Sequence, residues 1–180
     1  MIEIVEIFKI IGVFLGVIAF FWKIFDLFGS YLRINLEVKQ EGTGSSRSVS
    51  ALTTVDNKGF LSKRIDYAGL LIGPEDEDPV ITAKHIAKEL NIDENKIAYT
   101  NDLYILRTDS PSPIYTGRRA FIPLPFFFDE QVNIGDETLR YHCTIDTVRL
   151  IKNTSYSVRF FIFTKHRLHR STHDLFRNDL

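Results

Sequence analysis

Three histidines near the C-terminus are the residues of this chain whose type and spacing suggest chemistry. His166, His169 and His173 form an H-x2-H-x3-H pattern within TKHRLHRSTHD. Histidine is the commonest metal ligand, and closely spaced histidines resemble half of a zinc site. A catalytic zinc helix instead spaces its histidines four apart around a glutamate base, and no glutamate is interleaved here. The three histidines are weak metal candidates, so a His-based metal-dependent hydrolase is the least favoured function.

Basic and hydroxyl side chains interleave with these histidines and suggest anion binding instead. The pattern predicts a short amphipathic helix from Ser171 through Phe176, with Asp174 placed much as in a capping box. The N–H groups that open a helix hold phosphate well, and neighbouring Lys and Arg side chains add charge-assisted hydrogen bonds. The alternative is an exposed basic turn without a ligand. The residues predicted to bind an anion or a partner are Lys165, Arg167, His169, Arg170 and Ser171.

No other part of the chain carries a motif that is typical of an enzyme. The sequence has no Walker A loop, no G-x-S-x-G motif and no dinucleotide-binding glycine pattern. His142 and Cys143 are neighbours, so in a strand their side chains point to opposite faces and cannot act as a pair. The consecutive acids Glu75–Asp78 lack the ligand spacing of a calcium loop. We therefore expect no catalytic residue and no cofactor.

An apolar stretch near the N-terminus predicts a helix that would anchor the rest of the chain. Ile10–Trp22 contains thirteen residues without a charge, and the apolar run resumes beyond Lys23. A helix over Ile10–Phe28 would be about 28 Å long, close to the ~30 Å hydrocarbon core of a bilayer. The acidic start argues against a signal peptide, and the lack of polar alternation argues against a buried core helix. We predict a single transmembrane helix that contacts the lipid bilayer.

Small and charged residues recur along one stripe of this predicted helix. At ~100° per residue, spacings of three and four put them on the same face. A G-x-x-x-G pair lets two helices approach closely in lipid, so the stripe predicts a homo-oligomer. The alternative is that small residues are merely common in spans and that the charges reach the membrane interface. The stripe consists of Gly12, Gly16, Ala19, Lys23 and Asp26.

The basic residues around the span predict its orientation. Only Lys9 precedes it, whereas Lys23, Arg33 and Lys39 follow. Because the flank richer in Lys and Arg stays in the cytoplasm, we expect a single-pass membrane protein with a cytoplasmic soluble domain. Cys143 agrees, since a single cysteine cannot form an intrachain disulfide.

The charge of the soluble part is unevenly distributed. The net charge of the chain is −1, but Glu75–Glu137 contains thirteen acids and six Lys or Arg, whereas Arg149–Leu180 contains seven Lys or Arg and two acids. This basic end suits an acidic protein partner, anionic lipid or a small anionic ligand, unless it is only a solvated edge. Nucleic acid is not expected as a partner.

Alternating apolar and polar residues predict a chain that is mainly β after the span. One helix is predicted over Val80–Leu90, with Asp78 as its N-cap. Pro123 and Pro125 remove two donors from one side of Arg118–Phe128, which predicts an edge strand. The predicted strands are Tyr31–Lys39, Val49–Val55, Lys63–Gly73, Lys96–Tyr99, Leu103–Thr108, Arg118–Phe128, Thr138–Ile145 and Tyr156–Phe163.

These elements predict an antiparallel β-sandwich, immunoglobulin-like in outline, with one inserted helix and a short C-terminal helix. A small closed barrel is the alternative. We expect residues 1–30 to form the anchor and residues 31–180 the soluble domain. The favoured function is a membrane-anchored binding module that uses the edge strand near Phe121–Phe128 or the basic end Arg167–Arg170. The alternative is a membrane effector whose β domain senses a small anionic ligand and whose helix oligomerises.

Overall fold

The structure is a computed structural model of the 180-residue chain. It describes residues 2–28, 32–42, 48–59, 62–107, 112–124, 131–132, 138–164 and 167–179.

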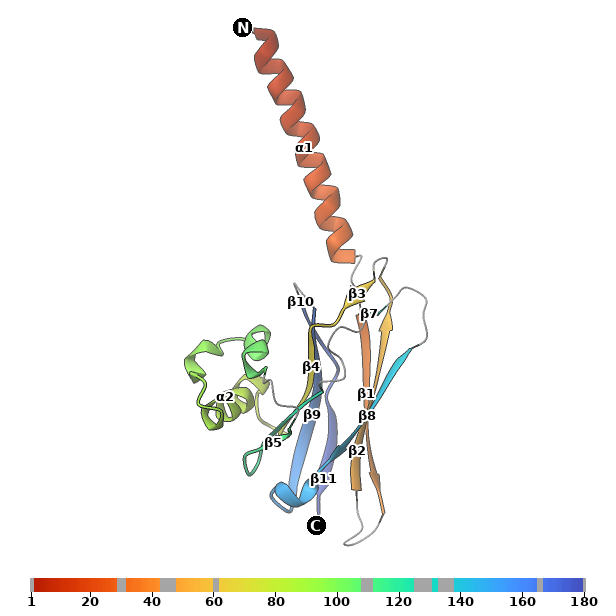
Figure 1. Ribbon diagram of the computed structural model, residues 1–180, viewed down its shortest axis with the longest axis vertical. Helices are drawn as coiled ribbons and strands as arrows, with labels where there is room; N and C mark the ends of the chain where they lie inside the picture. The colour runs from red at the N-terminus through yellow and green to blue at the C-terminus, as the bar shows by residue number, and fades with distance from the viewer. Residues whose placement is uncertain are drawn as a thin grey trace.

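The N-terminal helix α1, Ile2–Phe28, projects away from the rest of the molecule (Figure 1). Its window Glu6–Ile24 is long and apolar enough to cross a membrane, by length and composition. None of that window is buried against the rest of the described chain. In water such a surface would expose a long row of large apolar side chains, which is costly unless another apolar phase covers it.

Two antiparallel sheets form the body of the protein (Figure 1). The first has the order β1-β2-β8, and the second has the order β10-β9-β4-β6-β5 with β11 also paired to β9. A separate two-stranded ribbon pairs β3 with β7. The strands are β1 Leu32–Glu41, β2 Ser48–Asn57, β3 Lys63–Arg64, β4 Tyr67–Pro74, β5 Ile114–Tyr115, β6 Ala120–Pro123, β7 Gln131–Val132, β8 Leu139–Ile145, β9 Thr154–Thr164, β10 Arg167–Arg170 and β11 Asp174–Asn178.

The two sheets share one hydrophobic core. Ile34 of β1 and Val55 of β2 belong to the same buried cluster as Leu70 of β4 and Phe160 of β9. The strands reach this core with every second residue, as the alternating burial of β1 and β2 shows.

A polar contact joins the edges of the two sheets. The Val38 N–H of β1 donates a hydrogen bond to Asp174 Oδ2 of β11 at 2.6 Å. Two residues further along β1, the Gln40 side chain donates to the Arg177 carbonyl at 3.3 Å. Edge strand β1 is therefore covered in part by the C-terminal strand of the other sheet.

A helical layer covers the other face of the second sheet (Figure 1). It contains α2, Pro79–Glu89, and the 3-10 turns η2, Glu94–Lys96, and η3, Thr100–Leu106. A further turn, η5, Thr147–Arg149, follows β8. Ile86 of α2 and Leu106 of η3 pack with Phe121 and Phe161 of the sheet into a second buried cluster. The second sheet is thus apolar on both faces, which accounts for the unbroken apolar centre of β4.

Several local predictions are confirmed. Asp78 caps α2, and its Oδ1 accepts a hydrogen bond from the Val80 N–H at 2.7 Å. The chain leaves α2 through Asn91, whose φ of 55° is the left-handed conformation that asparagine tolerates. Strands β1, β2, β8 and β9 lie where the sequence pattern predicts them, within two residues at each end.

The strands predicted at Lys96–Tyr99 and Leu103–Thr108 are wrong, because 3-10 turns occupy this part of the chain. Asp102 supplies one reason, since its carboxylate accepts hydrogen bonds from the N–H groups of Ala98 and Tyr99 and so closes a tight turn. Leu103 and Leu106 are buried three residues apart, which is one turn of a 3-10 helix rather than the period of a strand.

The short C-terminal helix predicted from Ser171 through Phe176 is also wrong. Its second half lies in strand β11, which pairs with β9. Burial alternates along β11: Phe176 and Asn178 are buried, and Leu175 and Arg177 are exposed. A helix this short would be only marginally stable, whereas the edge of β9 offers backbone hydrogen bonds to a strand.

Two predictions about sheet edges need correction. The strand predicted over Arg118–Phe128 is β6, which pairs with β4 on one side and β5 on the other, so it is not an edge strand. Residues 125–128 of that stretch lie outside the described residues. The strand predicted over Lys63–Gly73 is split, because the chain leaves β3 and enters a different sheet at Tyr67.

Candidate anion-binding pocket

A β-bulge at the outer edge of the second sheet builds the candidate site. Arg170 of β10 is paired with Phe161, and Asp174 of β11 is paired with Val158. Three residues, 171–173, therefore lie opposite two residues of β9, 159–160. An extra residue of this kind bends the strand and redirects side chains, and bulges are common next to functional sites.

Ser171 holds the bulge against β9. Its N–H donates to the Phe160 carbonyl at 2.9 Å, and its Oγ accepts from the Phe160 N–H at 3.0 Å. The next two residues, Thr172 and His173, are exposed.

Strand alternation then decides which side chains reach the helical layer. Arg159, Phe161 and Arg170 lie on the face of the sheet that α2 covers. His169 lies on the opposite face, where it is buried and its Nε2 is 3.4 Å from the Thr164 Oγ1. Because successive side chains of a strand point to opposite faces, His169 lies on the face opposite to Arg159 and Arg170.

An open pocket of about 580 Å³ lies between the bulge and the helical layer. The sheet contributes two arginines and an aromatic floor, and the helical layer contributes the start of α2 and one threonine. The residues that line the pocket are Asp78, Pro79, Thr100, Arg159, Phe161, Arg170, Ser171, Thr172 and His173.

Arg159 is the unusual residue of this pocket. It is partly buried, and among the residues that the structure describes its guanidinium has no hydrogen bond or ion pair. Burial lowers the pKa of Arg159, the charge of Arg170 lowers it further, and Asp78 opposes both. Because an arginine keeps its proton at neutral pH, the pocket contains a partly desolvated positive charge with five donors to offer.

The structure brings together only some of the residues predicted to form a site. Arg170, Ser171 and His173 line the pocket, whereas His169 does not. Lys165 and His166 lie outside the described residues, and Arg167 is described by its backbone alone. Over the described part of the chain, no group of three His, Cys, Asp or Glu side chains is arranged to hold a metal ion.

Sequence reasoning missed Arg159, Asp78 and Thr100 as pocket residues. Arg159 has a signal in the sequence, because it interrupts the apolar strand YSVRFFIF. A lone charge in such a strand is costly to bury and is therefore a candidate for a role. Asp78 and Thr100 give no comparable signal, since the fold alone brings them to the bulge.

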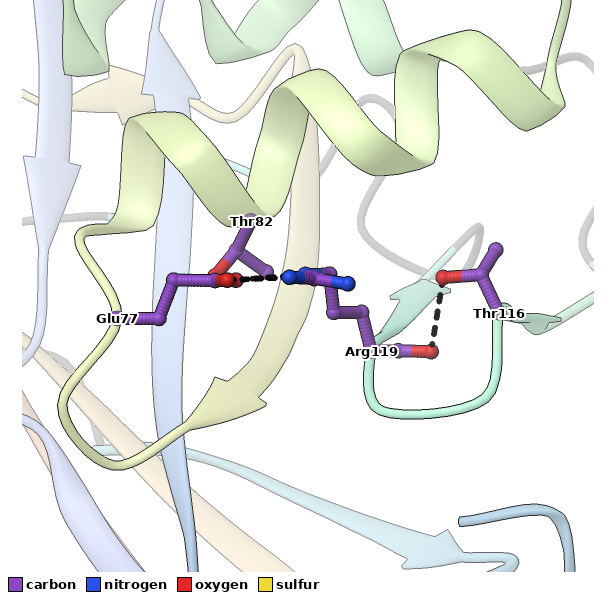
Figure 2. Close-up of polar contacts among 4 residues, drawn as sticks. All are labelled: Glu77, Thr82, Thr116 and Arg119. Atoms are coloured by element: carbon purple, nitrogen blue, oxygen red, sulfur yellow. Dashed lines mark hydrogen bonds and ion pairs between the residues drawn. The ribbon is translucent and has the colours of Figure 1, made fainter. Parts of the chain in front are cut away.

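An ion pair fixes the start of α2 next to the pocket (Figure 2). Arg119 donates from Nε to Glu77 Oε2 at 2.6 Å and from Nη2 to Glu77 Oε1. The Thr82 hydroxyl adds a third donor at 2.7 Å. Figure 2 shows Arg119 reaching from the turn that also carries Thr116. The acids that precede α2 are therefore used for structure, Glu77 as a partner of Arg119 and Asp78 as a cap.

The remaining predicted positions are the stripe on α1 and Cys143. Gly12, Gly16, Ala19 and Lys23 are exposed on α1, and the side chain of Asp26 lies outside the described residues. Cys143 lies half-buried in β8, and burial raises the pKa of its thiol to about 11, which makes it a poor nucleophile.

Comparison of the chain with protein-family models, curated proteins and solved structures finds no match.

Proposed function

We propose that this protein is a single-pass membrane-anchored, non-enzymatic binding module whose β domain holds a small anionic ligand in the bulge pocket. The observation that carries the proposal is Arg159, a partly buried guanidinium without a partner among the described residues, beside a second arginine. Paired arginines suit carboxylate and phosphate groups because each offers two parallel donors.

The anchor in this proposal is α1 and the binding domain is residues 31–180. Support for the anchor comes from the length and full exposure of the window Glu6–Ile24. Support for a β-sandwich, immunoglobulin-like in outline, comes from the two antiparallel sheets that share a core. The Lys and Arg bias that follows the helix supports a cytoplasmic domain.

Binding of inorganic pyrophosphate to the full chain in mild detergent tests the ligand half of the proposal. We expect saturable binding by calorimetry, weakened at least about tenfold by Arg159→Gln, since a charge-assisted hydrogen bond contributes ~1.5–3 kcal/mol. Arg140→Gln is the matched control, because Arg140 is exposed on β8 of the other sheet. Equal affinities in the two variants would show that the pocket is not the binding site.

A second candidate is a membrane effector that assembles through α1, with the same pocket as its sensor. A methyl group added at Gly12 or Gly16 would meet no described atom within 4 Å beyond the neighbouring backbone of its own helix, so no other part of the described chain packs on this stripe. Light scattering of the full chain in detergent tests it against a Gly12→Ile, Gly16→Ile variant. An oligomer that the variant reduces to a monomer supports assembly through the stripe, and a monomeric parent chain excludes it.

A further inference from the structure

The pocket is lined by both positively and negatively charged side chains, and this combination limits the kind of ligand that fits it. We infer that the ligand is a phosphate ester of a hydroxyl-bearing organic body, of the size of a sugar phosphate or a nucleotide. The inference rests on the proposed function, because it assumes that Arg159 and Arg170 hold the anionic group.

Asp78 is the negatively charged residue of the pocket. One oxygen, Oδ1, accepts the Val80 N–H, and the carboxylate makes no other hydrogen bond with the residues that the structure describes. Asp78 is exposed and lines the pocket together with Arg159 and Arg170, yet it forms an ion pair with neither within the described chain. Its free lone pairs repel a bare anion and accept a hydrogen bond from a donor.

Thr100 extends the polar wall on the side of the helical layer. Its hydroxyl has no hydrogen bond among the described residues, and it lines the same pocket as Asp78. A ligand that places its anionic group on the bulge therefore meets an acceptor and a hydroxyl at its other end. Hydroxyl groups satisfy both, because each hydroxyl can donate to a carboxylate and also accept from a threonine.

The size of the pocket leaves room for an organic body. A volume of about 580 Å³ would hold roughly twenty waters at ~30 Å³ each, far more than a free phosphate displaces. Pockets of ~300–1,000 Å³ take ligands of the size of ordinary small organic molecules. Pro79 and Phe161 supply apolar surface in the same pocket for such a body to cover.

The charge of the pocket favours phosphate over a single carboxylate. Arg159 and Arg170 contribute two positive charges, and His173 adds a ring nitrogen that can take part in a hydrogen bond. A phosphate monoester has up to two negative charges and three terminal oxygens, so it matches two guanidiniums better than one carboxylate does.

The test compares four probes on the full chain in detergent: glucose 6-phosphate, phenyl phosphate, inorganic phosphate and glutamate. Phenyl phosphate is the matched probe, because it has the phosphate and a ring but no hydroxyl. We expect glucose 6-phosphate to bind at least about tenfold more tightly than the other three, with the binding lost in Arg159→Gln.

Asp78→Asn separates the two ends of the pocket. Asparagine caps helices about as well as aspartate, so α2 should persist, and a thermal melt of the variant checks this. We expect the substitution to weaken glucose 6-phosphate binding about fivefold and to leave phenyl phosphate and inorganic phosphate unchanged or slightly tighter.

The outcomes distinguish this inference from the function on which it rests. Arg159-dependent binding in which phenyl phosphate equals glucose 6-phosphate, or in which Asp78→Asn tightens every probe, overturns the hydroxyl-bearing ligand and leaves the anion site. Preferred binding of glutamate shows an amino-carboxylate ligand and overturns the phosphate ester. Absence of Arg159-dependent binding for all four probes overturns both.

Discussion

Removal of the Glu77 carboxylate should unfold the protein at much lower denaturant concentration. Arg119 donates two charge-assisted hydrogen bonds to Glu77, and Thr82 donates another. Both partners are largely buried, with side chains 14% and 19% exposed. Breaking a buried ion pair costs ~3–5 kcal/mol and an exposed one ~0–1 kcal/mol. For this mostly buried pair we expect Glu77→Gln to cost about 2–3 kcal/mol.

A double-mutant cycle with Arg119→Met isolates the pair from the separate effects of each substitution. We expect a coupling free energy of about 2 kcal/mol between Glu77 and Arg119. The exposed pair Lys39–Glu37, whose charged atoms are 3.4 Å apart, is the control and should couple by less than ~0.5 kcal/mol. Urea unfolding of the full chain in detergent, followed by circular dichroism at 218 nm, measures both. At a slope of ~1.5–2 kcal/mol/M, the Glu77→Gln midpoint falls by about 1–2 M.

The pH dependence of the effect follows from the pKa of Glu77. Burial alone would raise that pKa, but the hydrogen bonds from Arg119 and Thr82 and the charge of Arg119 outweigh it and hold the pKa below 4.5. A lowered carboxylate pKa stabilises the folded state above the unfolded value, and the contribution is lost as pH falls through the folded value. The stability difference between the parent chain and Glu77→Gln should therefore be complete at pH 7 and shrink below about pH 4.5. A coupling under 0.5 kcal/mol, or a difference that does not shrink in acid, would refute the reasoning.

Two further perturbations test the packing around the pocket and the β8 edge. Gly73→Ala should destabilise the protein by about 1–3 kcal/mol, because the new methyl group would overlap the Thr82 Oγ1 and lie 2.9 Å from the Thr82 Cγ2, on a short, branched side chain. Gly12→Ala is its control and should not destabilise the protein in the same urea titration, since the added methyl group meets no described atom within 4 Å beyond the neighbouring backbone of its own helix. Cys143, whose pKa is raised to about 11, should react with iodoacetamide at pH 8 about 100-fold more slowly than in the urea-unfolded chain, where its pKa is ~8.5. Equal rates in folded and unfolded protein would show that the thiol is exposed.

The strands that could be predicted are those whose burial repeats every two residues. β1 and β2 each bury one face and expose the other, so alternation alone indicates them. The cap of α2 was equally predictable, because the reason for it lies within the same few residues. The predicted anchor helix follows from composition, which requires no knowledge of the tertiary structure.

The failures share a physical cause. The stretch from Ser171 through Phe176 looks like a helix in isolation, and its second half forms strand β11 only because β9 presents a free edge to it. β6 looks like an edge strand because of its prolines, although the fold supplies β5 as a second neighbour. In each case a pairing partner decides the conformation, whether it lies well upstream, as β9 does for β11, or just across a turn, as β5 does for β6. The pattern of the strand itself contains no information about that partner.

The candidate site could not be predicted from the sequence for the same reason, but a comparison of two arginines in the structure points to it. Arg119 and Arg159 both lie where the second sheet meets the helical layer, and Glu77 and Arg159 line the same small cleft. Arg119 has a carboxylate partner there, whereas Arg159 has none among the described residues. Both charges lose part of their hydration when the helical layer covers the sheet, but only Arg119 has a hydrogen-bonded carboxylate partner in the described chain. Within the same residues, Arg159 has only the nearby charge of Asp78, without an ion pair. The proposed anion would supply the hydrogen-bonded partner that Arg159 lacks in the described chain, and its binding would therefore stabilise the fold.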